Sequence, residues 1–300
     1  MTAAASKQTG VKLGLISLAL MAALFAGLFV FGPTRTAEKA TAAQTGQAFD
    51  ILTILNDAPT RGAVSALRAA NPGTYSQLQT AAAFAHADDA DAQALSMLVL
   101  EALFSQFKAQ ALTLRSADSA GYQAIISELG AGFEQLKSNN NAWCNGATVA
   151  VFLTKNDDDL IPSLLSEFPY QSPQYDWAMT WMSTVLNVAA ESRRAPRRHA
   201  APTDLDEVRL QQAGLDLSAQ QWSLALQIGA FANAEGTSYA QMQDVVGSMN
   251  VCELGVAVAA VSGQLPRDVR ARIWADLMPE LMYGNTPYVI WRVNDYFFIG

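Results

Sequence analysis

The chain has 300 residues, of which 51% are hydrophobic and only 15% are charged. Its formal net charge of −8 argues against general nucleic-acid binding, because neutralising backbone phosphates requires a basic surface. A chain of this length and apolar content can bury the core of one large domain or two small ones.

The first predicted element is a membrane-spanning helix. Leu13–Phe31 contains no charged side chain, and as a helix it would be roughly 30 Å long, the thickness of a bilayer's hydrocarbon core. Residues 1–12 are a short tail, 13–32 the anchor and 33–46 a linker. We therefore expect the chain to contact membrane lipid through Leu13–Phe31.

The compartment follows from this anchor. Lys7 and Lys12 precede it and slightly favour a cytoplasmic N-terminus, and frequent alanine with more arginine than lysine is typical of GC-rich bacterial genomes. The sequence thus predicts a single pass through a bacterial inner membrane, with the body in the periplasm. Ala40-Thr41-Ala42 has the form of a signal-peptidase site, so a cleaved, secreted helical binding module is the alternative.

The body is predicted to be helical. Through residues 47–192 apolar side chains recur at three- and four-residue spacing, which indicates a helical domain. The expected helices are Gln47–Asn56, Thr60–Ala70 with Thr60 as its cap, one capped by Thr74, one opened by Asp88, Asp89 and Asp91, one that begins at about Ser119 and is stopped by Ser138-Asn139-Asn140-Asn141, and Tyr175–Ala190.

Two segments of this domain are less regular. Ala147–Leu153 fits a strand or a short buried helix, and we favour the helix because no partner strand is evident. Lys155–Asp159 is predicted to be a solvated turn. Its Asp157-Asp158-Asp159 run lacks the alternating spacing and the glycine of a calcium loop, so a weak cation site is only the alternative.

An Arg/Pro-rich segment, 193–202, is predicted to be an exposed linker before a C-terminal helical subdomain, 203–300, that ends in an aromatic tail. The helices expected there are Asp204–Ala213, Ser218–Ala234, Ser238–Ser262 and Arg267–Met278. The fold class is therefore mostly α, with one N-terminal transmembrane helix followed by a multi-helix globular body.

Two clusters are candidate partner contacts. The first comprises Arg193, Arg194, Arg197 and Arg198, which can meet phosphate headgroups, an acidic partner or the neighbouring acidic residues, unless the segment is merely solvated. The second is the aromatic tail with Tyr288, Trp291, Tyr296, Phe297 and Phe298, which either packs on the body or anchors an interface.

Cys144 and Cys252 are the two cysteines of the chain. An even count in an oxidising compartment predicts a disulfide, and two buried thiols are the alternative. A metal site is not expected, because the cysteines are isolated in sequence and His86 and His199 are the two histidines.

No catalytic or cofactor motif is present in the sequence, and no cofactor is expected. Glu191-Ser192 resembles the Glu-Ser pair of lysozyme-like lytic transglycosylases, but that family's Gly-rich and Met-Gln elements are absent and we assign no family. The leading hypothesis is a non-enzymatic subunit or an assembly or scaffolding factor that docks on a larger membrane or envelope complex. The alternative is a membrane-tethered cell-wall or peptide hydrolase with Glu191 or Glu253 as its acid.

Overall fold

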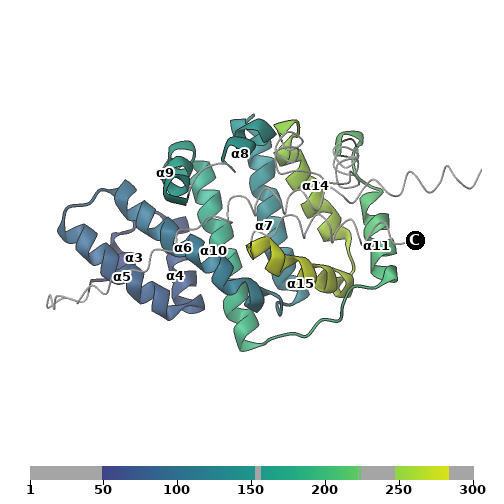
Figure 1. The fold of residues 1–300 in the computed structure, drawn as a ribbon, viewed down its shortest axis with the longest axis horizontal. Coiled ribbons are helices and arrows are strands. Elements are labelled where there is room, and N and C mark those ends of the chain that lie inside the picture. The colour runs from purple at the N-terminus through teal and green to yellow at the C-terminus, as the bar shows by residue number, and fades with distance from the viewer. Residues whose placement is uncertain (1–48, 153–156, 222, 224–246, 284–300) are drawn as a thin grey trace, which may run out of the picture.

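A computed structural model describes residues 49–152, 157–221, 223 and 247–283. The described residues are mostly helical and contain no β-strand, which confirms the predicted α class (Figure 1). The elements are α3 (Ile51–Ile54), α4 (Ala58–Ala70), α5 (Pro72–Ala87), α6 (Ala92–Leu114), α7 (Ser119–Ser138), the 3-10 turn η1 (Ala142–Cys144), α8 (Gly146–Phe152), α9 (Asp157–Glu167), α10 (Pro173–Arg194), α11 (Asp204–Gly214), α14 (Val251–Gln264) and α15 (Arg267–Tyr283).

Short polar side chains decide where several of these helices begin. Asp57 and Asn71 accept hydrogen bonds from the backbone N–H groups of Thr60 and Thr74, at 2.7 and 3.2 Å. Each cap is followed by a proline in the first helical turn, where the missing N–H does no harm. The caps therefore lie three residues before Thr60 and Thr74, and the expectation that these threonines are the caps was wrong. Proline also commonly separates two helices, and this obscures its place in a first helical turn.

Helix α10 lies at the centre of the body, between α4 and α7 (Figure 1). Its apolar face, with Tyr175, Met179 and Val185, is buried. The indole N–H of Trp181 donates to the carbonyl of Ile125 in α7 at 3.2 Å, so the ring both fills the core and satisfies its polar atom.

Helices α7 and α14 approach each other closely. Gly130 of α7 faces Ala259 of α14, and a Cβ at position 130 would lie 2.3 Å from the Ala259 Cβ. Gly255 of α14 faces the ring of Phe133 in the same way. The hydrophobic core is consequently continuous from α4 to α15, on both sides of the predicted linker at 193–202.

Several helix boundaries differ from expectation, including the end of α3 at Ile54 instead of Asn56. α10 runs on to Arg194, α14 begins only at Val251 after a break at Ser248–Asn250, and α15 reaches Tyr283. Asp157, expected in a turn, is the first residue of α9. The short helix favoured near Ala147–Leu153 is confirmed as α8.

The anchor Leu13–Phe31, the 33–46 linker and the aromatic tail lie outside the described residues. Among the helices that the structure does describe, none combines the length and the apolar character needed to span a bilayer.

Candidate functional site

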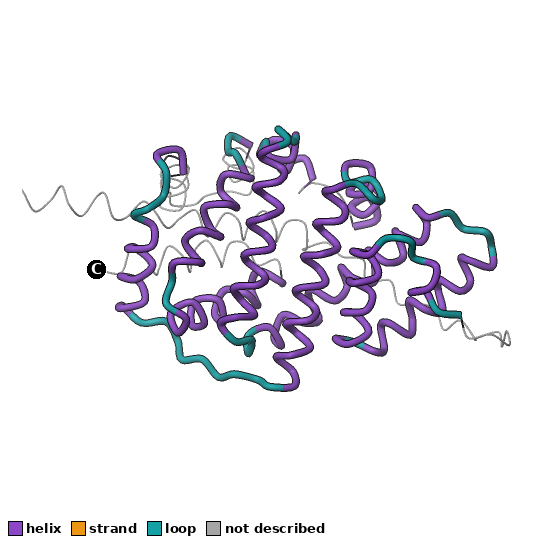
Figure 2. Tube along the Cα trace, turned by 180° about the vertical axis from the view of Figure 1, so that it is seen from behind, coloured by secondary structure: helices purple, strands orange, loops and turns teal. Residues whose placement is uncertain are grey.

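The segment between α10 and α11, residues 195–203, runs along one edge of the body (Figure 2). It carries two of the predicted arginines, Arg197 and Arg198, whereas Arg193 and Arg194 belong to the end of α10. Its backbone is fastened to the turn after α6: the N–H of Arg197 donates to the carbonyl of Ser116 at 2.9 Å, and His199 Nε2 donates to the carbonyl of Ala117 at 2.7 Å. The arginines of this segment are therefore carried on an attached strap rather than on a loose linker.

The turn that receives the strap is itself fixed from beneath. The buried hydroxyl of Tyr122 donates to the carbonyls of Leu114 and Arg115, at 2.8 and 3.0 Å. Burial raises the pKa of Tyr122 well above its ordinary value, so this phenol remains a hydrogen-bond donor at physiological pH.

A groove lies between the end of α6, the strap and α15. It encloses about 390 Å³. Its cationic lining residues are Arg115, Arg197, Arg198 and Arg272, with His199 beside them, and the remaining lining residues are Leu112, Ser116, Ala200, Ala201, Pro202, Ala275 and Asp276. We call this feature the arginine groove.

Arg272 differs from the other three because its guanidinium is neutralised by carboxylates. It donates to both oxygens of Asp206 at 2.6 and 2.8 Å, and to Asp268 at 2.9 Å. Burial alone would raise the pKa of Asp206, but hydrogen bonds from Arg272 and Thr203 outweigh it and hold that pKa below its ordinary value. Within the described residues, no hydrogen bond or ion pair engages the guanidinium of Arg115, Arg197 or Arg198.

The two arginines at the end of α10 face different environments. The guanidinium of Arg193 turns inward and donates to the carbonyl of Ala70 and to the side chain of Gln110. Arg194 is exposed and does not line the groove. Arg193, Arg194, Arg197 and Arg198 are thus all exposed, but only Arg193 among them has its guanidinium bonded to α4 and α6 within the described residues.

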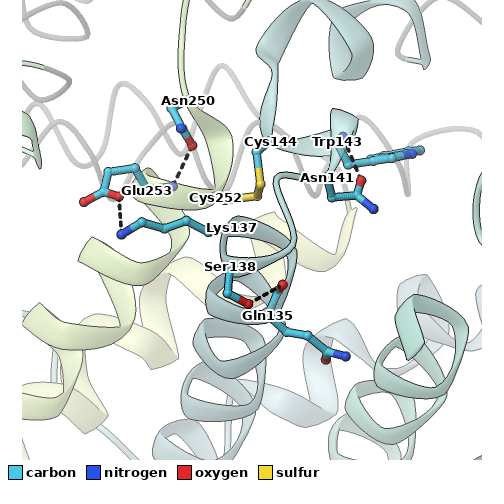
Figure 3. The surroundings of a disulfide bond; sticks show 9 residues. All are labelled: Gln135, Lys137, Ser138, Asn141, Trp143, Cys144, Asn250, Cys252 and Glu253. Atoms are coloured by element: carbon cyan, nitrogen blue, oxygen red, sulfur yellow. Dashed lines mark hydrogen bonds and ion pairs between the residues drawn. A yellow bond between two sulfur atoms is a disulfide. The ribbon is translucent and has the colours of Figure 1, made fainter. Parts of the chain in front are cut away.

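The second candidate region surrounds the cysteines (Figure 3). The sulfur atoms of Cys144 and Cys252 lie 1.95 Å apart, which confirms the predicted disulfide. Asn141 and Asn250 cap the two segments that carry them, with Asn250 accepting from the N–H of Glu253 at 2.9 Å. The bond fastens η1 to the first turn of α14 across more than a hundred residues of sequence.

Neither candidate acid of the hydrolase hypothesis lies in an open polar cleft. Glu253 is buried beside the disulfide, and its carboxylate is 2.5 Å from the ammonium of Lys137 (Figure 3). That contact raises the pKa of Lys137. Glu191 is exposed on α10. Glu253 is thus buried and has one carboxylate oxygen paired with Lys137.

One small cavity in the body is lined by apolar side chains and offers no catalytic groups. A cavity of about 80 Å³ lies between α6, α7, α9 and α10, lined by apolar and aromatic side chains such as Phe104, Phe133 and Phe168. In the parts of the chain that the structure describes, no three His, Cys, Asp or Glu side chains gather in a way that could hold a metal ion.

Sequence reasoning found Arg197 and Arg198 but missed Arg115, which reaches the groove from the end of α6. It also missed the pairing of Arg272 with Asp206. The pattern Thr203-x-x-Asp206 is a capping-box signal that indicated the position of Asp206, but not its partner on α15.

Comparisons of the chain with protein-family models, with curated proteins and with solved structures gave no match.

Proposed function

We propose that the protein is a single-pass, membrane-anchored helical subunit or assembly factor that docks on a larger envelope complex. In this proposal Leu13–Phe31 holds the chain in a bacterial inner membrane, and the helical body lies in the periplasm. The protein performs no catalysis of its own and serves as a docking body.

The disulfide is the observation that carries this proposal. Structural disulfides persist in oxidising compartments and are rare in a reducing cytosol. The Cys144–Cys252 bond is buried within a helical body that follows a strongly apolar N-terminal segment. A body outside the cytosol, tethered to the membrane, accounts for both features together.

The surroundings of the two carboxylates support docking over the hydrolase alternative. A catalytic carboxylic acid must reach its substrate and exchange a proton with it. Glu253 is closed off by Lys137, and the exposed Glu191 lies on the surface of α10. The hydrolase alternative therefore rests on Glu191, whose exposed side chain lacks the apolar pocket that a carboxylic-acid catalyst needs.

Co-purification tests the docking role. The full chain is extracted from its native membrane in mild detergent, and bound proteins are identified by mass spectrometry. We expect a discrete set of membrane-protein partners, reduced by Trp291→Ser with Phe297→Ser in the predicted contact tail. Leu205→Ser with Leu215→Ser, at two exposed apolar positions, is the matched control and should retain them. Recovery of the chain alone would contradict the proposal.

The compartment has an independent test. Titration of the denatured, unreduced protein with a thiol reagent, directly after extraction from cells, should find no free thiol. Two free thiols would contradict a periplasmic body.

A further inference from the structure

We propose that the arginine groove binds a phosphate-bearing anion through Arg115, Arg197 and Arg198. This site goes beyond the docking function and does not depend on it, since the arginines that define it are described residues of this chain and the predicted contact tail is not needed to place them.

The arginine groove concentrates positive charge on an acidic protein. The protein carries a net charge of −8, yet four arginines line this one hollow. Asp276 is the only carboxylate among its lining residues in the described part of the chain. Cations concentrated in one hollow of an acidic protein create a local field that attracts anions and repels other cations.

The carboxylates of Asp206 and Asp268 do not neutralise Arg115, Arg197 or Arg198. Asp206 lies close by in sequence, but both of its oxygens bind Arg272, and Asp268 binds the same guanidinium. Of the lining arginines, Arg272 thus belongs to the framework of the wall. Arg115, Arg197 and Arg198 retain donor N–H groups for a ligand.

The backbone that carries the arginines is already held in place before a ligand binds. The strap is fixed by the bonds from Arg197 N–H to Ser116 and from His199 Nε2 to Ala117, and the receiving turn is fixed by Tyr122. A site whose backbone is already ordered spends less conformational entropy on binding than a mobile linker would. The cations are thus held on one side of the hollow by the strap and on the other by α6.

The chemistry of the guanidinium group favours phosphate as the anion. The planar guanidinium presents paired N–H donors that match phosphate oxygens, and a phosphate monoester carries about −1.5 to −2 charges at neutral pH, more than a single carboxylate. A volume of about 390 Å³ also leaves room for a group attached to the phosphate. That phosphate belongs either to a soluble compound or to an anionic lipid headgroup, whose phosphodiester carries one negative charge but offers the same oxygen acceptors.

The experiment uses the full chain in nanodiscs and has two arms. In the first, nanodiscs of phosphatidylcholine are titrated with pyrophosphate by calorimetry. In the second, hydrogen exchange of residues 195–203 is compared between phosphatidylcholine nanodiscs and nanodiscs that contain phosphatidylglycerol. Circular dichroism confirms that each variant is folded.

The test variant is Arg197→Ser with Arg198→Ser, and the control is Arg194→Ser with Arg209→Ser, which removes the same charge from exposed positions outside the groove. Because hydrogen bonds to charged groups contribute substantially to binding, we expect the test variant to weaken pyrophosphate binding by about tenfold or more. The control should stay within about twofold, as expected for remote, screened charges.

Binding in the first arm that the test variant loses identifies a soluble phosphate compound as the ligand. Protection of 195–203 in phosphatidylglycerol alone, also lost in the test variant, identifies a lipid headgroup. Absence of both signals overturns the proposal, and so does an equal loss in the control variant, because the effect would then reflect net charge rather than the groove.

Discussion

Charged side chains are paired and partly buried at the α7–α14 junction, but exposed and, within the described residues, unpaired at three positions of the arginine groove. At the junction Lys137 meets the buried Glu253, glycine allows the two helices to approach closely, and a disulfide closes the end. In the groove Arg115, Arg197 and Arg198 face solvent with no carboxylate bound to them among the described residues.

The difference separates charge needed for folding from charge available for binding. A buried ion must have a partner, because leaving it unpaired destabilises the fold by several kcal/mol. An exposed cation has no such requirement and contributes little to stability. The fold does not require Arg115, Arg197 and Arg198 to be paired, so their guanidinium groups are available to a ligand.

The largest expected effect is at the junction. Replacing both cysteines by alanine removes a cross-link that closes a loop of about 100 residues, and unfolding free energy should fall by roughly 4 kcal/mol in the chain-entropy account. Urea unfolding measures this loss. Wild-type protein treated with reductant keeps both thiols and should show a similar loss; a change below about 0.5 kcal/mol, the size of an ordinary surface substitution, would show that the bond does not hold the two halves together.

The next largest loss of stability is expected at the ion pair between Asp206 and Arg272, in the wall of the groove. Asp206→Asn leaves Arg272 without its buried partner and should lower stability at neutral pH by about 3 kcal/mol. Because the folded-state pKa of Asp206 lies below its ordinary value of 3.8, its contribution is present above that pH and is lost as the pH falls through the folded-state pKa.

The measurement is urea unfolding of wild type and variant from pH 7 down to about pH 2, a range that crosses the carboxylate titration. The difference in unfolding free energy between wild type and variant should decrease as the pH falls. Asp268→Asn, which removes the exposed partner of the same guanidinium, is the control and should cause a much smaller loss. A gap that widens in acid would contradict the pairing.

A smaller effect is expected from helix proximity. Gly130→Ala places a methyl group against Ala259 and should destabilise by about 2 kcal/mol through overpacking, although alanine favours helices. Gly62→Ala is the matched control: its Cβ would lie 3.7 Å from the hydroxyl of Ser183, so it should stabilise by about 0.5–1 kcal/mol. Thermal unfolding that moves in the same direction for both would refute the close approach of α7 and α14.

The smallest effect compares two neighbouring arginines. Arg193→Met removes hydrogen bonds to Ala70 and Gln110 and should lower the unfolding free energy by about 1 kcal/mol. Arg194→Met should remain within about 0.5 kcal/mol of wild type, because the side chain is exposed. Equal losses at the two positions would show that the hydrogen bonds of Arg193 to Ala70 and Gln110 do not contribute to stability.

Local sequence signals predicted what depends on neighbours along the chain. The apolar period placed α7 at Ser119, and the even cysteine count led to Cys144–Cys252. The caps at Asp57 and Asn71 were missed because the prolines after them look like breaks, although proline fits the first turn of a helix.

The groove was not predictable because its parts are distant in sequence. His199 meets Ala117 across 82 residues, and Arg272 meets Asp206 across 66. No periodicity in one segment reports which carbonyl or carboxylate another segment will present. The strap therefore looked like an ordinary solvated linker, and Arg115 like an ordinary residue at the end of a helix.

The division between folding charge and binding charge has one direct test: urea unfolding of Arg197→Ser with Arg198→Ser, with and without pyrophosphate. Without the anion, we expect stability within about 0.5 kcal/mol of wild type. With it, wild type should gain stability by linkage and the variant should not. A variant already destabilised without the anion, or one that gains as much as wild type, would contradict the account.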